Sequence, residues 1–376
     1  MLVCEIYTLT PHRRLSEWRC LQGFSLIELM ISLALGLIIV AAALSAYVGT
    51  AGAARMAEAQ GRMYEDAQAA LTILTQQLRM AGNNPDQTDR LDTSVKDPIY
   101  TKPTSSGLTY SGDVSPEFVD ALVTPALELS NYSIRGCDGA FSNVTAATSL
   151  DELDCVATAA VIAEPDSIAL SYQADEFNTV PAIASAPPPT DCLGYALNKI
   201  KAEIPGIPVG PGLGVFSSVP KDVFYFMADN RFYIDTSSAT ATPPSVPSLY
   251  CQGNGIDSKA QPLVENIEDM QITYGVEIPD NQTRTVAGYM RADELLVHPD
   301  LTAFSAQERW RKVVTVRICL LLRSENAVVS DSASARYFNC AGTLETSPPD
   351  DLRLRRAYST TVMLRNWLEI TAHTSL

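Results

Sequence analysis

One apolar run near the N-terminus constrains this chain most. It covers residues 24–48, about 25 positions, and Glu28 is its only charged residue. A helix of that length can span a bilayer. A carboxylate inside such a segment costs free energy and usually has a functional partner. The simpler alternative is that Glu28 lies close enough to a helix end to reach the polar interface.

The flanks of the run predict how it is oriented and processed. Residues 1–22 carry Arg13, Arg14 and Arg19, and the formal net charge of the whole chain is -16. This asymmetry predicts a cytoplasmic N-terminus and an external C-terminus. A secretory signal places its small-residue cleavage site after the apolar core. Here Gly23 precedes the run, so a cut at that point would remove the leader and keep the apolar helix.

The apolar run continues as an amphipathic segment. No proline occurs between residues 24 and 84, and Gly82-Asn83-Asn84-Pro85 is a stop signal. We therefore predict one helix from about residue 24 to about residue 81, roughly 85 Å long. Its second half would place one apolar stripe on a globular domain. The stripe consists of Met56, Ala59, Met63, Ala67, Ala70, Leu71, Leu74 and Leu78.

Beyond Pro85 the sequence predicts strands and loops. Pro- and Ser-rich stretches at 181–190 and 240–248 are expected to be surface loops. The turn-like residues 228–230 would join two strands as a hairpin, 313–322 would be a central strand, and 359–364 would close the sheet. The class is α+β, one long helix against antiparallel sheet. The expected strands are 167–172, which alternates like a half-buried strand, 223–227, 231–234, 270–276, 313–322 and 359–364.

The cysteines favour an oxidising compartment. Six of the eight lie beyond residue 100, in a Pro- and Ser-rich region. The alternative is six unpaired buried thiols, and sequence alone leaves the pairing open. Proximity in the chain suggests the candidate disulfides Cys137–Cys155, Cys192–Cys251 and Cys319–Cys340.

No residue pattern predicts catalysis, a metal or a cofactor. The three histidines are scattered, and no CxxC, GxSxG, HExxH or P-loop sequence occurs. Asp229, Asn230 and Asp235 could be imagined as calcium ligands, but their spacing is not that of an EF-hand loop and a polar turn is the simpler interpretation. The acidic charge also argues against a nucleic-acid partner.

One basic cluster remains, at 353–356 in the sequence Arg-Leu-Arg-Arg. It is either a solvated strand edge or a docking point for an acidic patch on a partner.

The N-terminal residues resemble a known signal. Gly-Phe-Ser-Leu-Ile-Glu-Leu at 23–29, followed by about 20 apolar residues and an amphipathic continuation, resembles the class III signal of type IV pilins and type II secretion pseudopilins. Segments at 263–275, 310–318 and 353–366 are similar to parts of PilW-like minor pilins. The resemblance implies a type IV pilin-like fold, with a long N-terminal helix packed on a β-rich antiparallel head.

The resemblance also implies how the chain is processed and into which segments it divides. Prepilin peptidase would cut between Gly23 and Phe24, and the new amine of Phe24 would be N-methylated. Glu28 would then pair with that amine, on its own chain or on a neighbour, and so set the register of insertion into a fibre. The parts would be a leader (1–23), a transmembrane and assembly half of the helix (24–48), an amphipathic half (49–81) and a periplasmic or extracellular head (85–376).

The implied function is that of a minor pilin. The chain would sit in the bacterial inner membrane and then at or near a pilus tip, where it would help to start fibre assembly. Its partners would be other minor and major pilins, the inner-membrane assembly machinery and membrane lipid. Two alternatives stay open: a type II secretion pseudopilin, which shares the N-terminus, and a tip adhesin whose 85–260 region binds a surface.

Overall fold

The computed structural model describes most of the helix and head. The described residues are 24–82, 133–146, 150–156, 164–175, 178–179, 188–204, 221–236, 246–278, 285–331 and 333–365. The leader, Gly23 and most of both predicted surface loops lie outside them. Contacts within the chain divide it into two units, 1–58 and 59–376.

Helix α1 runs over Leu26–Met80, which confirms the single long helix expected from the sequence. It ends where the stop signal predicts. The Ala81 N–H still donates to the Gln77 carbonyl, and Gly82 adopts a φ of 70°, a left-handed conformation that glycine enters at little cost. Six residues of the predicted stripe are buried: Met63, Ala67, Ala70, Leu71, Leu74 and Leu78.

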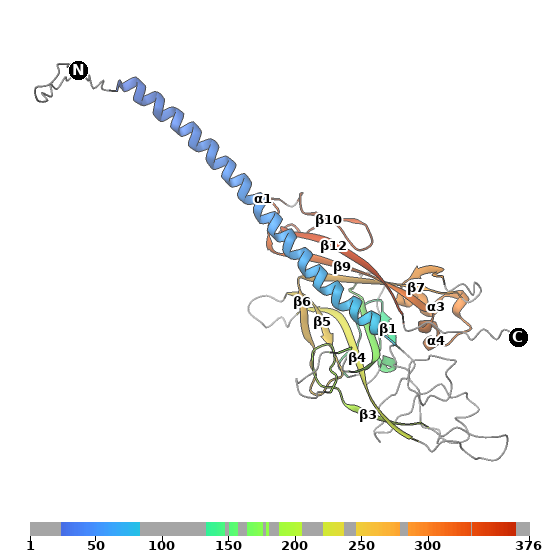
Figure 1. The fold of residues 1–376 in the computed structure, drawn as a ribbon. Coiled ribbons are helices and arrows are strands. Elements are labelled where there is room, and N and C mark those ends of the chain that lie inside the picture. Colours follow the sequence, from blue (N-terminus) through green and yellow to red (C-terminus); the bar gives the residue numbers. More distant parts are fainter. Residues whose placement is uncertain are drawn as a thin grey trace, which may run out of the picture. The chain divides into compact units, whose positions relative to one another are not determined.

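The first sheet is antiparallel and has six strands in the order β1-β2-β4-β5-β6, with β3 also paired to β4 (Figure 1). Its long strand β4 is central because it pairs with β3, β2 and β5 along different parts of its length. The strands are β1 (Ile134–Cys137), β2 (Ser167–Ala174), β3 (Lys199–Ile204), β4 (Lys221–Thr236), β5 (Pro247–Gln252) and β6 (Gln261–Glu265).

The second sheet is also antiparallel, in the order β12-β9-β7-β8. The expected central strand 313–322 forms most of β9, and 359–364 falls at the end of the edge strand β12, as predicted. A separate hairpin pairs β10 with β11. The strands are β7 (Ile267–Val276), β8 (Gly288–Met290), β9 (Val313–Ala327), β10 (Arg336–Phe338), β11 (Leu344–Thr346) and β12 (Arg353–Met363). The short helices are η1 (Leu150–Glu152), α3 (Ala292–Val297), η3 (Pro299–Leu301) and α4 (Ala306–Arg311).

A single residue joins the two sheets. Strand β6 ends at Glu265 and β7 begins at Ile267, with Asn266 between them at a φ of 64°. Asparagine tolerates this left-handed conformation better than most residues. The Asn266 carbonyl also accepts the N–H of Arg323 from β9, at 3.0 Å. The chain therefore changes sheets without a loop.

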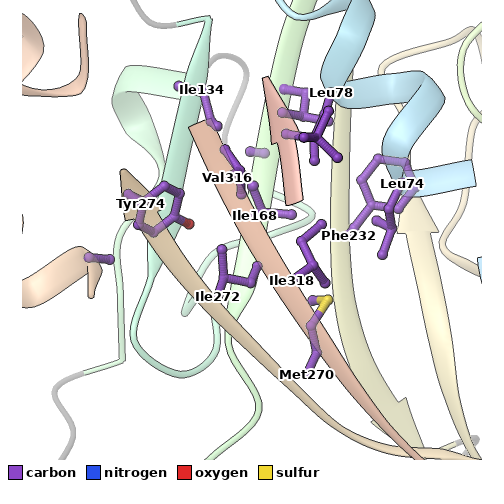
Figure 2. Packing of buried hydrophobic residues seen from close by; sticks show 14 of the residues in the cluster. Leu74, Leu78, Ile134, Ile168, Phe232, Met270, Ile272, Tyr274, Val316 and Ile318 are labelled. Carbon is purple, nitrogen blue, oxygen red and sulfur yellow. The ribbon is translucent and has the colours of Figure 1, made fainter. Parts of the chain in front are cut away.

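Helix and sheets share one core. Figure 2 shows Leu74 and Leu78 of α1 beside Phe232 of β4, with residues of β2 and β9 close by. The side chains of Leu74, Leu78 and Phe232 are fully buried. The amphipathic half of α1 thus supplies part of the head's hydrophobic core, which is the role that the 3.6-residue spacing predicts.

The predicted hairpin at 223–234 is wrong, because this segment is the continuous strand β4. The residues taken as a turn lie in its middle, where Leu170 of β2 faces Asn230. Asn230 is fully buried with its side-chain amide satisfied: Oδ1 accepts the Cys192 N–H at 3.0 Å, and Nδ2 donates to Gln77 Oε1 at 2.8 Å. These distant partners keep a turn-forming residue in a strand.

Strand β2 also differs from the prediction, because the alternation at 167–172 predicts a half-buried strand whereas β2 is buried on both faces. Its second face carries Ser167, Ala169 and Ser171, which are small. They allow the segment after β1 to approach closely, and the Ser167 hydroxyl donates to the Gly139 carbonyl at 2.8 Å. A polar residue in an alternating pattern does not have to face water.

Candidate assembly site

Residues 24–58 form a unit whose apolar side chains are exposed. Phe24 is 86% exposed and Ile39 is 68% exposed. Helix α1 is long and apolar enough to cross a membrane, and its most apolar part has no buried residue. A surface of this kind is not stable in water, so it requires lipid or the apolar surfaces of other chains.

Glu28 forms a capping box with Ser25 at the start of α1. The Glu28 carboxylate accepts the Ser25 N–H at 3.4 Å, and the Ser25 hydroxyl accepts the Glu28 N–H at 3.3 Å. The Leu29 N–H donates to the Ser25 carbonyl at 3.1 Å and closes the first turn. Because the first N–H groups of a helix have no partner inside it, this reciprocal pair satisfies two of them.

The sequence also contains a local signal for this cap, which is separate from any partner of Glu28 in the membrane. Ser25-Leu26-Ile27-Glu28 is the Ser-x-x-Glu pattern that starts helices. Among the described residues the carboxylate accepts no hydrogen bond other than that from Ser25. An ionised carboxylate can accept about four hydrogen bonds, so Glu28 keeps the capacity to bind a cation as well.

Three disulfides link parts of the head. They join Cys137 to Cys155, Cys192 to Cys251 and Cys319 to Cys340, which are the pairs that proximity in the chain suggests. The first lies at the edge of the first sheet. The third ties β9 to the turn of the β10–β11 hairpin.

The basic cluster at 353–356 is largely used inside the head. Arg355 is buried, and its Nε donates to Glu268 Oε2 at 2.6 Å while Nη1 donates to the Ser347 hydroxyl at 2.7 Å. Arg355 also pairs with Asp351 and lies over the Tyr337 ring of β10, 5.6 Å from its centroid. Burial opposes the charged form, but the hydrogen bonds to both carboxylates outweigh it and raise the pKa of Arg355.

A buried carboxyl group links the two sheets. The Asp166 carboxylate accepts the Ile272 N–H of β7 at 2.7 Å and the Gly139 N–H at 3.1 Å, and the Asp166 N–H donates to the Met270 carbonyl. Burial raises the pKa of Asp166 to about 8, against the opposing effect of the Ile272 N–H.

The calcium interpretation of the 229–235 segment finds no support. Asp229 and Asn230 lie within β4, and the Asn230 side chain is bonded to Cys192, Gln77 and Tyr172. In the part of the chain that the structure describes, no three His, Cys, Asp or Glu side chains are grouped to hold a metal ion.

Comparison with known families shows which protein families this sequence resembles. Residues 231–366 match the family described as Type IV Pilus-assembly protein W, and residues 18–44 match the prokaryotic N-terminal methylation motif. The chain matches the PilW family of type IV pilus-assembly proteins. The matched segment begins within β4 and includes all strands from β5 to β12. The three segments whose sequence resembles PilW-like pilins fall inside this match.

The other comparisons add little to the PilW match. A type IV-like pilin from Thermus thermophilus is similar at 11% sequence identity and a TM-score of 0.24, over 54% of this chain and 79% of that one. No curated protein matches. The α+β assignment rests on the helix and the two antiparallel sheets described above.

Proposed function

We propose that this PilW-like chain is a minor pilin that prepilin peptidase cuts between Gly23 and Phe24 and that helps to start pilus assembly at or near the tip. The leader is 1–23, the membrane and assembly half of the helix is 24–48, the amphipathic half is 49–81 and the head is 85–376. The chain first sits in the inner membrane with its head in the periplasm. Other minor and major pilins then provide its contacts.

The exposed apolar unit at the start of α1 is the observation that carries this proposal. Such a surface needs an apolar environment, and the methylation motif matches the same stretch. Cutting after Gly23 places a new amine at Phe24, beside the capping residue Ser25. The Glu28 carboxylate can then form an ion pair with that amine, or with the amine of a neighbouring chain, while it still accepts the Ser25 N–H.

The family match favours a pilus over a secretion pseudopilus. The matching family is described as a pilus-assembly family, and its segment covers the second sheet rather than the N-terminus shared by both classes. The adhesin alternative concerns residues 85–260, many of which lie outside the described residues.

Mass spectrometry of the protein purified from its own cells tests the processing. We expect a mature chain that begins with N-methyl-Phe24 and whose intact mass is lowered by the three oxidised cysteine pairs. A chain that begins at Met1, or beyond residue 48, would contradict the proposal.

Variants at Glu28 separate the cap from the charge. We expect Glu28→Ala and Glu28→Gln to be processed normally, yet to be at least about tenfold less abundant in sheared fibres, because neither can neutralise a buried amine. Glutamine keeps an acceptor for the Ser25 N–H, so a purely structural cap would tolerate it. Ser25→Ala, which removes only the hydroxyl, is the matched control. Normal incorporation of Glu28→Ala into fibres would refute the assembly role.

A further inference from the structure

Strand β12 leaves one backbone edge unpaired. The Leu364 N–H donates to Val314, and the register with β9 is regular from Arg356 to Met363. In an antiparallel ladder alternate residues bond to the same neighbour, so residues 356–364 bond to β9 at even positions. The N–H and C=O groups of residues 357, 359, 361 and 363 therefore point outward. Within the described residues no strand pairs with them.

This edge lacks the protection that the other edges have. Edge strands are normally kept short, bulged, charged or interrupted by proline. In the described sheets β8 has three residues, β1 has four and is fixed by a disulfide, and β6 contains Pro262 and pairs through a bulge. Strand β3, which among the described residues pairs only with β4, carries three charged residues, Lys199, Lys201 and Glu203. The β12 edge is different. Residues 357–363 are Ala-Tyr-Ser-Thr-Thr-Val-Met, with no charge and no proline.

Space lies beside the edge. A groove of about 700 Å³ has Ser359 and Thr360 of β12 on one wall and α1 residues such as Gln68, Thr72 and Gln76 on another. The hydroxyl groups of β12 and the hydroxyl and amide groups of α1 lie beside Leu71, Met80 and Arg79 in this groove, and they can bond to the polar backbone of an added strand. Ser359, Thr361 and Met363 are all exposed along this edge.

The charges at the two ends of the edge restrict what can pair with it. Arg356 and Arg365 are both exposed, and the residues between them are uncharged. If a second copy paired antiparallel along the same edge, Arg356 of one chain would lie near Arg365 of the other. Like charges at such positions are unfavourable. A strand with a carboxylate near each end would instead be attracted.

We propose that β12 accepts an extended segment of another pilin as an added strand, uncharged in its middle and acidic near both ends. This inference rests on the proposed pilin function and names the surface through which the head meets its partner. Backbone hydrogen bonds would supply the affinity, and the two arginines would select the partner and set its register.

Photo-crosslinking of the full chain in its own cells tests the proposal. A benzoylphenylalanine in place of Met363 stands on the edge, and one in place of Phe338 on the β10–β11 hairpin is a matched control. The two native side chains are 59% and 62% exposed. We expect an adduct from position 363 alone, and peptide mapping should place it in a strand-like segment with acidic ends in another pilin.

Two substitutions block the edge in different ways. Ser359→Pro removes an outward N–H without removing a bond to β9, and Thr361→Lys adds a charge while leaving the backbone intact. Each should lower the yield of the adduct at least about tenfold. Ser359→Thr keeps the N–H and should leave the yield unchanged. Retention of all three disulfides in each variant confirms that the head is folded.

Three results would overturn the proposal: no adduct from position 363, an adduct to a second copy of this chain, or a yield that neither blocking variant changes. The same cells report on the proposed function separately, through N-methyl-Phe24 and the presence of the chain in fibres. Normal processing and fibre entry without an edge adduct would defeat only the edge proposal. Absence from fibres would defeat the pilin function.

Discussion

Asp166 bonds the two sheets to each other through both its side chain and its backbone. It stands just before β2 in the first sheet, yet its carboxylate and its N–H both bond to β7 in the second. With burial raising its pKa to about 8, it is largely neutral in the folded head at pH 7. No local pattern reveals this role, because it depends on a partner more than 100 residues away in the chain.

The raised pKa predicts that the Asp166 contribution to stability falls as the pH rises. The folded state keeps the proton up to about pH 8, whereas the ordinary pKa of an aspartate side chain, which applies in the unfolded chain, is 3.8. The contribution of Asp166 to stability is therefore fully present below the pKa of the unfolded state, and it is lost as the pH rises through the pKa of the folded state. Asp166→Asn cannot titrate, so its free energy of unfolding should depend less on pH over this range. Denaturant titrations at about pH 5 and about pH 9 measure the difference. Equal pH slopes in the two proteins would contradict the assignment.

The β10–β11 hairpin is held to the second sheet by one arginine and one disulfide. Arg355 stacks on the Tyr337 ring and bonds to Glu268, Asp351 and Ser347, whereas Cys340 bonds to Cys319 of β9. The hairpin is otherwise exposed, so these few contacts determine its position.

Arg355→Met should therefore destabilise the head by about 3 kcal/mol, because it leaves the Glu268 carboxylate partly buried with Arg323 as its remaining ion-pair partner among the described residues. The exposed neighbour Arg356→Met should cost less than about 0.5 kcal/mol. The double variant Arg355→Met with Glu268→Met should recover much of the loss. Thermal unfolding of the three proteins measures these costs. A loss as large for Arg356→Met would mean that the buried pair is not the cause.

Strands with long apolar runs could be predicted from the sequence, and the polar middle of β4 could not. The apolar runs of β7 and β9 were recognisable at once. The middle of β4 was not, because Asp229 and Asn230 favour turns locally and stay extended only through tertiary partners such as Asn254 and Gln77. The burial of Arg355 in the basic cluster could not be predicted either, because it depends on Glu268, which is 87 residues away in the chain.

The whole chain consists of two units with different environments. The described part of the first, residues 24–58, exposes most of its apolar residues, and the second has its own core, to which α1 contributes from Met63 onward. The N-terminal signal was readable because the Gly-Phe-Ser-Leu-Ile-Glu spacing is local. How much of the hydrophobic core of the head comes from α1 could be determined only from the packed structure.

A chain shortened to begin at Ala59 should be soluble without detergent and should unfold within a few degrees of the full chain, because it keeps all six buried residues of α1. A chain that begins at residue 72 loses four of them, Met63, Ala67, Ala70 and Leu71. It should be less stable by about 5 kcal/mol or more. Circular dichroism melting compares them. Equal stability of the two shortened chains would mean that α1 is not part of the core.

The direct passage through Asn266 has a consequence for cooperativity. A two-sheet head could unfold in stages, with one sheet opening while the other persists. Here β6 and β7 share a single connecting residue, whose carbonyl is bonded to β9. Neither sheet can shift its register without pulling the adjoining strand of the other. The two sheets should therefore gain and lose structure together, so that hydrogen exchange would report one cooperative unit rather than two.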